Sequence, residues 1–400
     1  MRELVLLAMS VVTGASCMRT PLNRLGASTS LADGGVFSPD GSAIRDSAVA
    51  STDGTSGKRD ALMTKPDLVN LGPPDAGGLE VPVIRADALP ISRDAAGVDR
   101  VARSLDAIPV PCTDQILIGH AGAVGGVAFS PDGQFLASAG NDHLGKIWRV
   151  SDGSLVQTMK GSTGYLAAVA YSPDGQMLVT GGSNDDDYSS GAVIFWRNDG
   201  TLVRAINTAY SYGVAFSPDG NTVASAHIDN QARLWSTDSG QLVRTLSGHT
   251  NYVTSVAFTP DGTTLASTGW DATVRLWNVS SGVLLATLAN GSQDARWGVA
   301  ISPDGTLVAS ADPGIGVQIW SLLNHQNLRT IYADSVMGLA FTPDGNFIVT
   351  AGSRVLIFSA SDGSLVNALG ENTSSVAVSP DGTRVAAGEP QGALKIFCLR

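Results

Sequence analysis

The sequence predicts an all-β protein, a seven-bladed β-propeller made of four-stranded antiparallel blades. Three observations support this prediction. A Ser/Thr-Pro-Asp-Gly turn occurs seven times between Pro131 and Pro380, with 37 to 45 residues from one proline to the next. Apolar runs of strand length precede and follow each turn, and an aromatic residue ends a third run in most copies. A period near forty residues is typical of a propeller blade.

The repeat around Pro260 shows how each strand is predicted. VTSVAF (253–258) and TTLAST (263–268) flank a turn in which proline presets φ at the second position and glycine suits the fourth. TVRLW (273–277) and VLLATL (283–288) are the third and fourth strands. These runs are apolar on both faces, so one blade cannot bury itself, whereas a closed ring of seven can.

The chain begins with a predicted export signal. Arg2 precedes an apolar run from Leu4 to Val12, which is too short to span a bilayer and fits a secretory signal peptide over 1–17. GASC at 14–17 resembles a bacterial lipobox, in which Cys17 is lipidated, but a glycine stands where a leucine-like residue is usual. Simple signal cleavage is the alternative. Both interpretations imply export to the bacterial cell envelope, in the periplasm or at the outer membrane, and only a lipid on Cys17 would attach the protein to a membrane.

Residues 18–110 are predicted to be a disordered tether, because their Ser/Gly/Ala/Pro-rich composition cannot bury enough apolar surface. An isolated VFSPDG at 36–41 has no strand pattern around it and is not counted as an eighth blade. The propeller is therefore expected over 111–400.

Charge and composition exclude several kinds of partner. The formal net charge of −11 argues against nucleic acid or an anionic membrane surface. No Gly-rich phosphate loop and no metal-binding His/Cys spacing occur, so neither cofactor nor metal is expected. Asp185, Asp186 and Asp187 form an acidic insertion that could bind Ca²⁺, but they lack the alternate spacing of a Ca²⁺ loop. A solvated loop is the favoured interpretation.

SGH at 247–249 and RLWN at 275–278 carry landmarks by which these repeats resemble WD40 repeats, over roughly 113–400, although the WD dipeptide is absent. The resemblance implies that two apparent hydrolase triads are instead buried structural tetrads, since the same spacing recurs in two repeats. The other repeats lack the full set and are expected to rely on packing. The two predicted tetrads are His120, Ser138, Asp142 and Trp148, and His249, Ser267, Asp271 and Trp277.

In WD40 proteins, three positions per blade commonly face the end of the ring where partners bind. At and beside those positions this chain concentrates Tyr and Trp in blades 2 to 5, although only 6% of its residues are aromatic. Aromatic, Met and Arg side chains are enriched at interface cores. The alternative is that the rings only close the mouth of the channel. The predicted crest consists of Tyr165, Tyr210, Tyr212, Tyr252, Trp270, Arg296, Trp297 and Met337.

These features predict a non-catalytic, monomeric scaffold that binds a protein or peptide through the crest. An exported propeller enzyme, either a hydrolase or a cofactor-dependent one, is an alternative that would need an acid or base there. A purely structural envelope component is a further alternative.

The last repeat stops after its third strand, ALKIFCLR (393–400). Aligned with the fourth repeat, residues 113–119 supply the missing strand, in the overlapping closure usual for WD40 rings. The alignment also places Cys112 opposite or diagonal to Cys398 across this seam, within reach of a modest adjustment to disulfide distance. We therefore expect a Cys112–Cys398 disulfide, with two unpaired thiols as the alternative.

Overall fold

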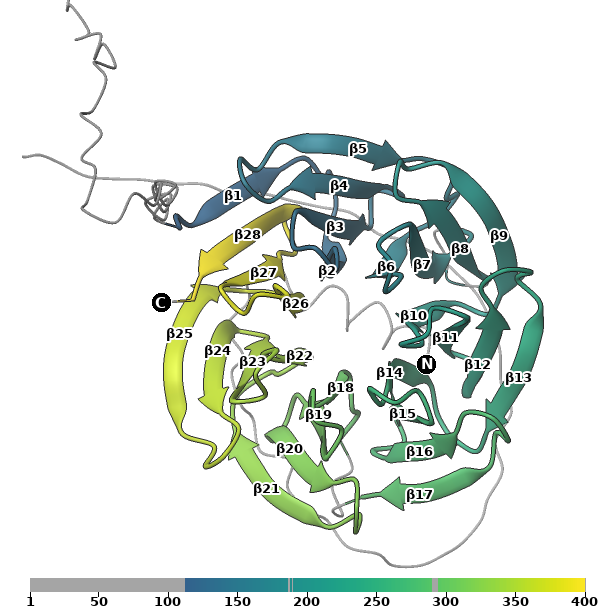
Figure 1. The fold of residues 1–400 in the computed structure, drawn as a ribbon, viewed down its shortest axis with the longest axis vertical. Coiled ribbons are helices and arrows are strands. Elements are labelled where there is room, and N and C mark those ends of the chain that lie inside the picture. The colour runs from purple at the N-terminus through teal and green to yellow at the C-terminus, as the bar shows by residue number, and fades with distance from the viewer. Residues whose placement is uncertain (1–111, 186–187, 189, 290–293, 400) are drawn as a thin grey trace, which may run out of the picture. The chain divides into compact units, whose positions relative to one another are not determined.

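A computed structural model describes residues 112–185, 188, 190–289 and 294–399. The predicted signal peptide, Cys17, the tether and the isolated VFSPDG lie outside the described residues. The described part of the chain forms seven four-stranded antiparallel sheets arranged as the blades of a ring (Figure 1). The predicted fold class and blade count are confirmed.

Two strands of every blade lie nearest the central channel. The innermost strands are β2 (Val124–Phe129), β6 (Leu166–Tyr171), β10 (Ser211–Phe216), β14 (Val253–Phe258), β18 (Val299–Ile301), β22 (Gly338–Phe341) and β26 (Ser375–Val378). The second strands are β3 (Phe135–Gly140), β7 (Met177–Ser183), β11 (Thr222–His227), β15 (Thr264–Gly269), β19 (Leu307–Asp312), β23 (Phe347–Ala351) and β27 (Arg384–Gly388).

The other two strands extend each blade toward the rim. The third strands are β4 (Gly145–Arg149), β8 (Gly191–Arg197), β12 (Gln231–Ser236), β16 (Val274–Asn278), β20 (Gly316–Ser321), β24 (Arg354–Ser359) and β28 (Ala393–Cys398). The outer strands are β5 (Leu155–Met159), β9 (Leu202–Thr208), β13 (Leu242–Ser247), β17 (Leu284–Leu288), β21 (Asn327–Tyr332), β25 (Leu365–Glu371) and β1 (Gln115–Ile118). In the fourth blade, β14 to β17 match the four predicted strands to within one residue.

The hydrophobic core is divided among the contacts between neighbouring blades. One cluster joins Leu234 and Leu246 of blade 3 to Val256, Leu265 and Trp277 of blade 4. Each interface in the described ring has such a cluster. Fully burying one large apolar side chain contributes roughly 1.5–3 kcal/mol. A blade therefore gains its stability from its neighbours, as the pattern of two-faced apolar strands predicted.

The Pro-Asp-Gly turns are built alike around the ring. In blade 3 the Ser217 hydroxyl donates a hydrogen bond to Asp219 Oδ1, at 2.5 Å, and Gly220 has φ of 73°. That positive φ is a conformation that glycine adopts without strain. Each turn proline also lies beside the glycine of the next turn, and the series closes with Pro380 beside Gly133. The turns thus form a second closed ring of contacts at one end of the blades.

The seam closes as predicted, with β1 paired antiparallel to β28. Cys112 and Cys398 form a disulfide with their Cα atoms 5.9 Å apart. The Cys398 amide donates to Asp114 Oδ1 at 3.0 Å. In blade 4 the equivalent amide, that of Asn278, donates to the Val283 carbonyl within a hairpin, at 2.9 Å. The disulfide and the Asp114 side chain therefore stand where the other blades have a hairpin turn.

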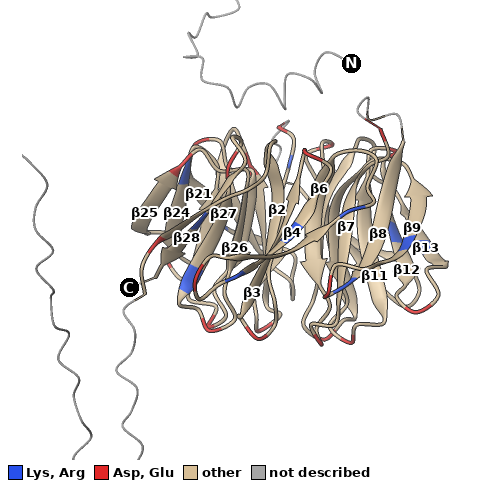
Figure 2. Cartoon of the chain, turned by 90° about the horizontal axis from the view of Figure 1, so that it is seen from above, with Lys and Arg blue, Asp and Glu red and all other residues tan. Residues whose placement is uncertain are grey.

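Charged side chains are sparse on the blades themselves. Figure 2 shows Asp and Glu gathered in the loops at both ends of the blades, with few Lys or Arg among them. Within the described residues there is no helix of the length and apolarity needed to cross a membrane.

Candidate binding site

Two of the seven blades contain the predicted tetrads. In blade 1, His120 Nδ1 lies 2.8 Å from Asp142 Oδ1, and His120 Nε2 lies 2.7 Å from Ser138 Oγ. Trp148 Nε1 donates to the same Ser138 oxygen at 2.9 Å. In blade 4, Trp277, Ser267, His249 and Asp271 are joined in the same way. The structure thus shows these residues hydrogen-bonded to one another in the interior.

Burial keeps the blade 1 histidine neutral. Desolvation lowers the pKa of His120, despite the hydrogen bond to Asp142. Burial opposes ionisation of Asp142, but the hydrogen bonds from His120 and the Ala121 amide prevail and hold the pKa of Asp142 below its ordinary value. A neutral imidazole donates from Nδ1 to the carboxylate and accepts the serine proton at Nε2. Every polar group of the tetrad is therefore paired, which stabilises the blade.

Blade 3 builds an equivalent network from a histidine at another position. His227 Nε2 lies 2.7 Å from Ser225 Oγ, which also accepts from Trp235 Nε1 at 2.7 Å. His227 Nδ1 lies 2.9 Å from the Ala209 carbonyl oxygen. The expectation that this blade relies on packing alone is wrong. His227 stands where blade 4 has Gly269, and a Cβ there would lie 2.8 Å from His249 Nδ1.

Arg296, a member of the predicted crest, is buried rather than accessible. Its side chain has 0% relative exposure. Nε donates to the Ala272 carbonyl at 2.7 Å, and Nη1 donates to Ser310 Oγ at 2.9 Å. The guanidinium also lies 5.0 Å from the centre of the Trp320 ring. Arg296 therefore occupies the place of the tetrad histidine in blade 5, and its assignment to the binding surface is corrected.

A continuous set of aromatic rings lies at the end of the ring opposite the Pro-Asp-Gly turns. Its members precede or begin inner strands, or they follow second strands. Neighbouring ring centres are 4.8–6.4 Å apart, and each of these pairs meets edge-on or tilted. Such geometries are the favoured ones for aromatic pairs. This aromatic arc consists of His143, Tyr165, Tyr188, Tyr210, Tyr212, Tyr252, Trp270 and Trp297.

Blade 4 has no aromatic residue at the inner-strand position where blades 3 and 5 have one. Tyr212 of blade 3 and Trp297 of blade 5 meet edge-on at 6.1 Å. Between them blade 4 offers the small residue Thr254, whose hydroxyl donates to the Arg296 carbonyl at 2.7 Å. Trp270 completes the group at 5.3 Å from Trp297. Rings from three blades thus share one surface.

The members of the arc differ in exposure. Tyr210 is only 1% exposed, so it forms the floor of the arc and not an accessible contact, which corrects its predicted place. Tyr165, Tyr212, Tyr252, Trp270 and Trp297 are half-buried. Met337 is also half-buried, immediately before β22 in blade 6. Half-buried rings are compatible both with binding and with closing the channel mouth.

Sequence reasoning missed two members of the arc. Tyr188 belongs to the acidic insertion and packs between Tyr165, at 5.4 Å, and Tyr210, at 5.1 Å. His143 contacts Tyr165 edge-on at 5.3 Å. Both have positive φ, 62° and 67° respectively, and so lie at sharp bends. The aromatic residue inside the insertion was the available signal for Tyr188, because tyrosine is rare in a purely solvated loop.

The acidic insertion shows no metal-binding arrangement among its described residues. Asp185 accepts a hydrogen bond from Ser190 at 2.7 Å. Residues 186, 187 and 189 lie outside the described residues. In the part of the chain that the structure covers, no three His, Cys, Asp or Glu side chains gather as a metal site requires.

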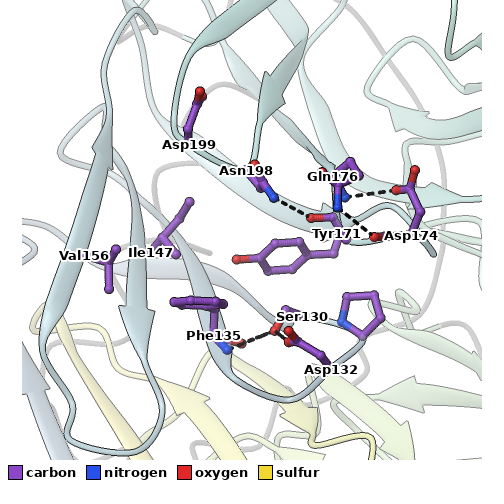
Figure 3. Close-up of a pocket in the computed structure, with 12 residues that line it drawn as sticks. Ser130, Asp132, Phe135, Ile147, Val156, Tyr171, Asp174, Gln176, Asn198 and Asp199 are labelled. Atoms are coloured by element: carbon purple, nitrogen blue, oxygen red, sulfur yellow. Dashed lines mark hydrogen bonds between the residues drawn. The ribbon is translucent and has the colours of Figure 1, made fainter.

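The opposite end of the ring has pockets between blades, which sequence reasoning did not find. The pocket between blades 1 and 2 has a volume of about 340 Å³ and holds Tyr171, whose hydroxyl points toward Ile147 and Val156 (Figure 3). Burial, and then the charge of Asp132, raise the pKa of Tyr171, so its hydroxyl stays protonated. Similar pockets recur between blades 4 and 5, 6 and 7, and 7 and 1. Their recurrence at several seams indicates that they follow from the repeat itself.

The fold and the tetrads define a propeller assembled from sequence repeats, with a continuous aromatic surface at one end. Five segments match the family model described as WD domain, G-beta repeat: 112–149, 153–196, 204–236, 240–278 and 325–367. The chain therefore carries WD40 repeats. The matches leave out 279–324, where Arg296 replaces the histidine, and the residues after 367.

The chain is similar to several curated proteins over part of its length. It is 34% identical over 158 residues to nuclear distribution protein PAC1 of Arthroderma benhamiae, covering 36% of this chain and 33% of that protein. It is 26% identical over 202 residues to autophagy-related protein 16 of Arabidopsis thaliana, covering 41% and 39%. An uncharacterised WD repeat-containing protein of Synechocystis is 46% identical over 46 residues, or 11% and 13%. The chain thus spans well under half the length of these relatives.

Proposed function

We propose that this chain is a non-catalytic scaffold that binds a protein or peptide through the aromatic arc. The observation that carries the proposal is the contact of rings from blades 3, 4 and 5 across one end of the propeller. Large, rigid aromatic side chains supply contact area at low cost in conformational entropy, and they dominate the energetics of protein interfaces. WD40 propellers typically bind proteins, which supports the same proposal.

Panning a random peptide library on the full chain tests this function. We expect peptides that bind the native protein and lose binding when Tyr212, Trp270 and Trp297 are all replaced with leucine. Leucine keeps apolar volume at these half-buried positions, and an unchanged thermal unfolding midpoint verifies the fold. Recovery of the same peptides by the triple variant would show that the arc is not the binding surface.

We further propose that the scaffold is exported and held at a bacterial cell envelope by a lipid on Cys17. The sequence GASC at 14–17 and the Cys112–Cys398 disulfide support this, since disulfides persist in oxidising compartments. Metabolic labelling with radioactive palmitate in a bacterial host is the test. Label should enter the native protein and be absent from Cys17→Ala, and unlabelled native protein in the soluble periplasmic fraction would contradict the anchor.

A further inference from the structure

We propose, building on the function above, that the arc takes a positively charged peptide segment and binds arginine side chains against Tyr188 and Tyr212. This assigns a chemical class to the partner. Three features of the arc favour such a ligand: the geometry of its rings, a buried hydroxyl without a partner among the described residues, and the charges nearby.

The rings of Tyr188, Tyr210 and Tyr212 offer the surfaces that a cation prefers. Tyr188 and Tyr210 meet at 5.1 Å with 71° between their planes, and Tyr210 and Tyr212 at 4.8 Å with 79°. The outer two rings thus each meet the Tyr210 ring near edge-on. A guanidinium within about 6 Å of a ring centre is attracted by the negative face of the ring. The same chain already stacks Arg296 on Trp320 and Arg204 on Phe195.

The floor of this stretch has an unused hydrogen-bonding group. Tyr210 Oη is buried and has no hydrogen-bond partner among the described residues. Burial, and then the neighbouring Tyr212 and Tyr188, raise the pKa of Tyr210, so the group is a neutral phenol. A buried polar group without a partner is destabilising. Because this oxygen is buried, an N–H donor must part the rings of Tyr188 and Tyr212 to pair with it, and guanidinium has five such donors.

A second unpartnered group fits the main chain of a peptide. The indole nitrogen of Trp270 is buried without an acceptor among the described residues. Because indole can only donate, its missing partner must be an acceptor. A peptide lying along the arc carries a carbonyl at every residue, so one segment supplies both the cation and the acceptor.

The charges around the arc favour a cation over a neutral or acidic ligand. Asp185 stands three residues before Tyr188, and Asp294 stands three residues before Trp297. Within the described loops that carry the rings, the basic residues are Lys160 and Arg296. Arg296 is buried, and its guanidinium is hydrogen-bonded inside the protein. The whole chain has a net charge of −11. A basic segment is therefore attracted to the arc and an acidic one repelled.

Fluorescence anisotropy of labelled octapeptides with the full chain tests the proposal. The probes are alternating glycine–arginine, glycine–citrulline and glycine–glutamate peptides. Citrulline keeps the shape of arginine but has no charge. We expect the arginine peptide to bind about tenfold more tightly than the citrulline peptide, and added salt to weaken it. The glutamate peptide should not bind, and a neutral β-glucan hexasaccharide should not compete.

Variants locate the site. Asp185→Asn combined with Tyr188→Leu should weaken the arginine peptide about tenfold. Tyr210→Phe keeps the ring and removes only the hydroxyl, so it should weaken binding about fivefold without lowering the thermal unfolding midpoint. Tyr332→Leu with Asp152→Asn is the matched control, because both side chains are exposed and neither residue belongs to the aromatic arc. Its affinity should equal that of the native protein.

Equal binding of the arginine and citrulline peptides, or unchanged binding by both site variants, would overturn the inference. Competition by the oligosaccharide would overturn it in favour of a carbohydrate ligand. The peptide-library experiment tests the proposed scaffold function independently of the cationic partner. If library peptides depend on Tyr212, Trp270 and Trp297 but are not enriched in arginine, the scaffold function stands and only the cationic partner is rejected.

Discussion

At the residue scale, blades 3, 4 and 5 each have a buried serine hydrogen-bonded to a basic side chain, but that side chain comes from a different position in each blade. In blade 4, His249 enters from a loop and Gly269 leaves room for it. In blade 3 the side chain enters from the strand itself, as His227. In blade 5 the long side chain of Arg296 reaches the equivalent serine. The network survives because a serine hydroxyl can donate to a neutral imidazole or accept from a guanidinium.

Replacing Arg296 with methionine should lower the free energy of unfolding by roughly 2–4 kcal/mol, because the Ala272 carbonyl and Ser310 lose a charged donor. Urea denaturation of the full chain measures this. Arg354→Met is the matched control, since Arg354 is exposed on β24. Equal stability of the two variants would show that Arg296 has no structural role.

Mild acid should destabilise the propeller through His227. Burial, and then the charge of Arg233, lower the pKa of His227 from 6.5 to about 4. Between these values the unfolded chain binds the proton and the folded chain does not. Stability is therefore complete above about pH 6.5 and falls as the pH decreases toward 4, by about 3 kcal/mol for this group. His120, whose pKa is also lowered, acts in the same direction.

Urea midpoints measured from pH 7 down to pH 4 check this dependence. The native protein should lose stability over that interval, and His227→Gln should lose less, because glutamine does not titrate. An identical slope in the variant would assign the acid sensitivity to other groups.

At the scale of single elements, β1 differs from the other outer strands because no hairpin turn connects it to its neighbour. It has only four residues, Gln115–Ile118, and pairs with β28 from the far end of the chain. Leu117 contributes to the core between blades 7 and 1. The Cys112–Cys398 disulfide, which closes a loop of 286 residues, holds this strand in place as a turn does in the other blades.

Removing the disulfide with Cys112→Ser and Cys398→Ser should lower the free energy of unfolding by roughly 2–5 kcal/mol, because the opened chain regains conformational entropy. Denaturation with and without reductant measures it. Reductant should bring the native protein to the stability of the double variant and leave that variant unchanged. Two alkylatable thiols at positions 112 and 398 in the folded, oxidised protein would refute the bond.

At the scale of the whole molecule, stability depends on closing the ring. Each described core cluster joins two blades, so a missing neighbour exposes apolar surface on both sides of the gap. The turn contacts also run around the full circle, from Pro380 to Gly133. The propeller should therefore unfold cooperatively and not blade by blade.

Two truncations test ring closure. A chain that starts at residue 112 keeps the disulfide and β1, and it should unfold at nearly the same temperature as the full chain. A chain that starts at 120 loses Leu117 from the core, together with the disulfide, and should aggregate or melt far earlier. Equal melting of the two chains would show that β1 is dispensable.

The sequence alone determined the blade count, the strand positions in blade 4 and the partners at the seam, whereas the two tetrads were implied by the resemblance to WD40 repeats. These depend on local turn chemistry and on a pattern repeated seven times, so one aligned repeat predicts the next. Only the tertiary structure decided that Tyr210 and Arg296 are buried, that Tyr188 joins the arc and that His227 replaces a loop histidine. Those outcomes depend on side chains from neighbouring blades and from an insertion outside the repeat. No pattern within one repeat encodes what its neighbours place against it.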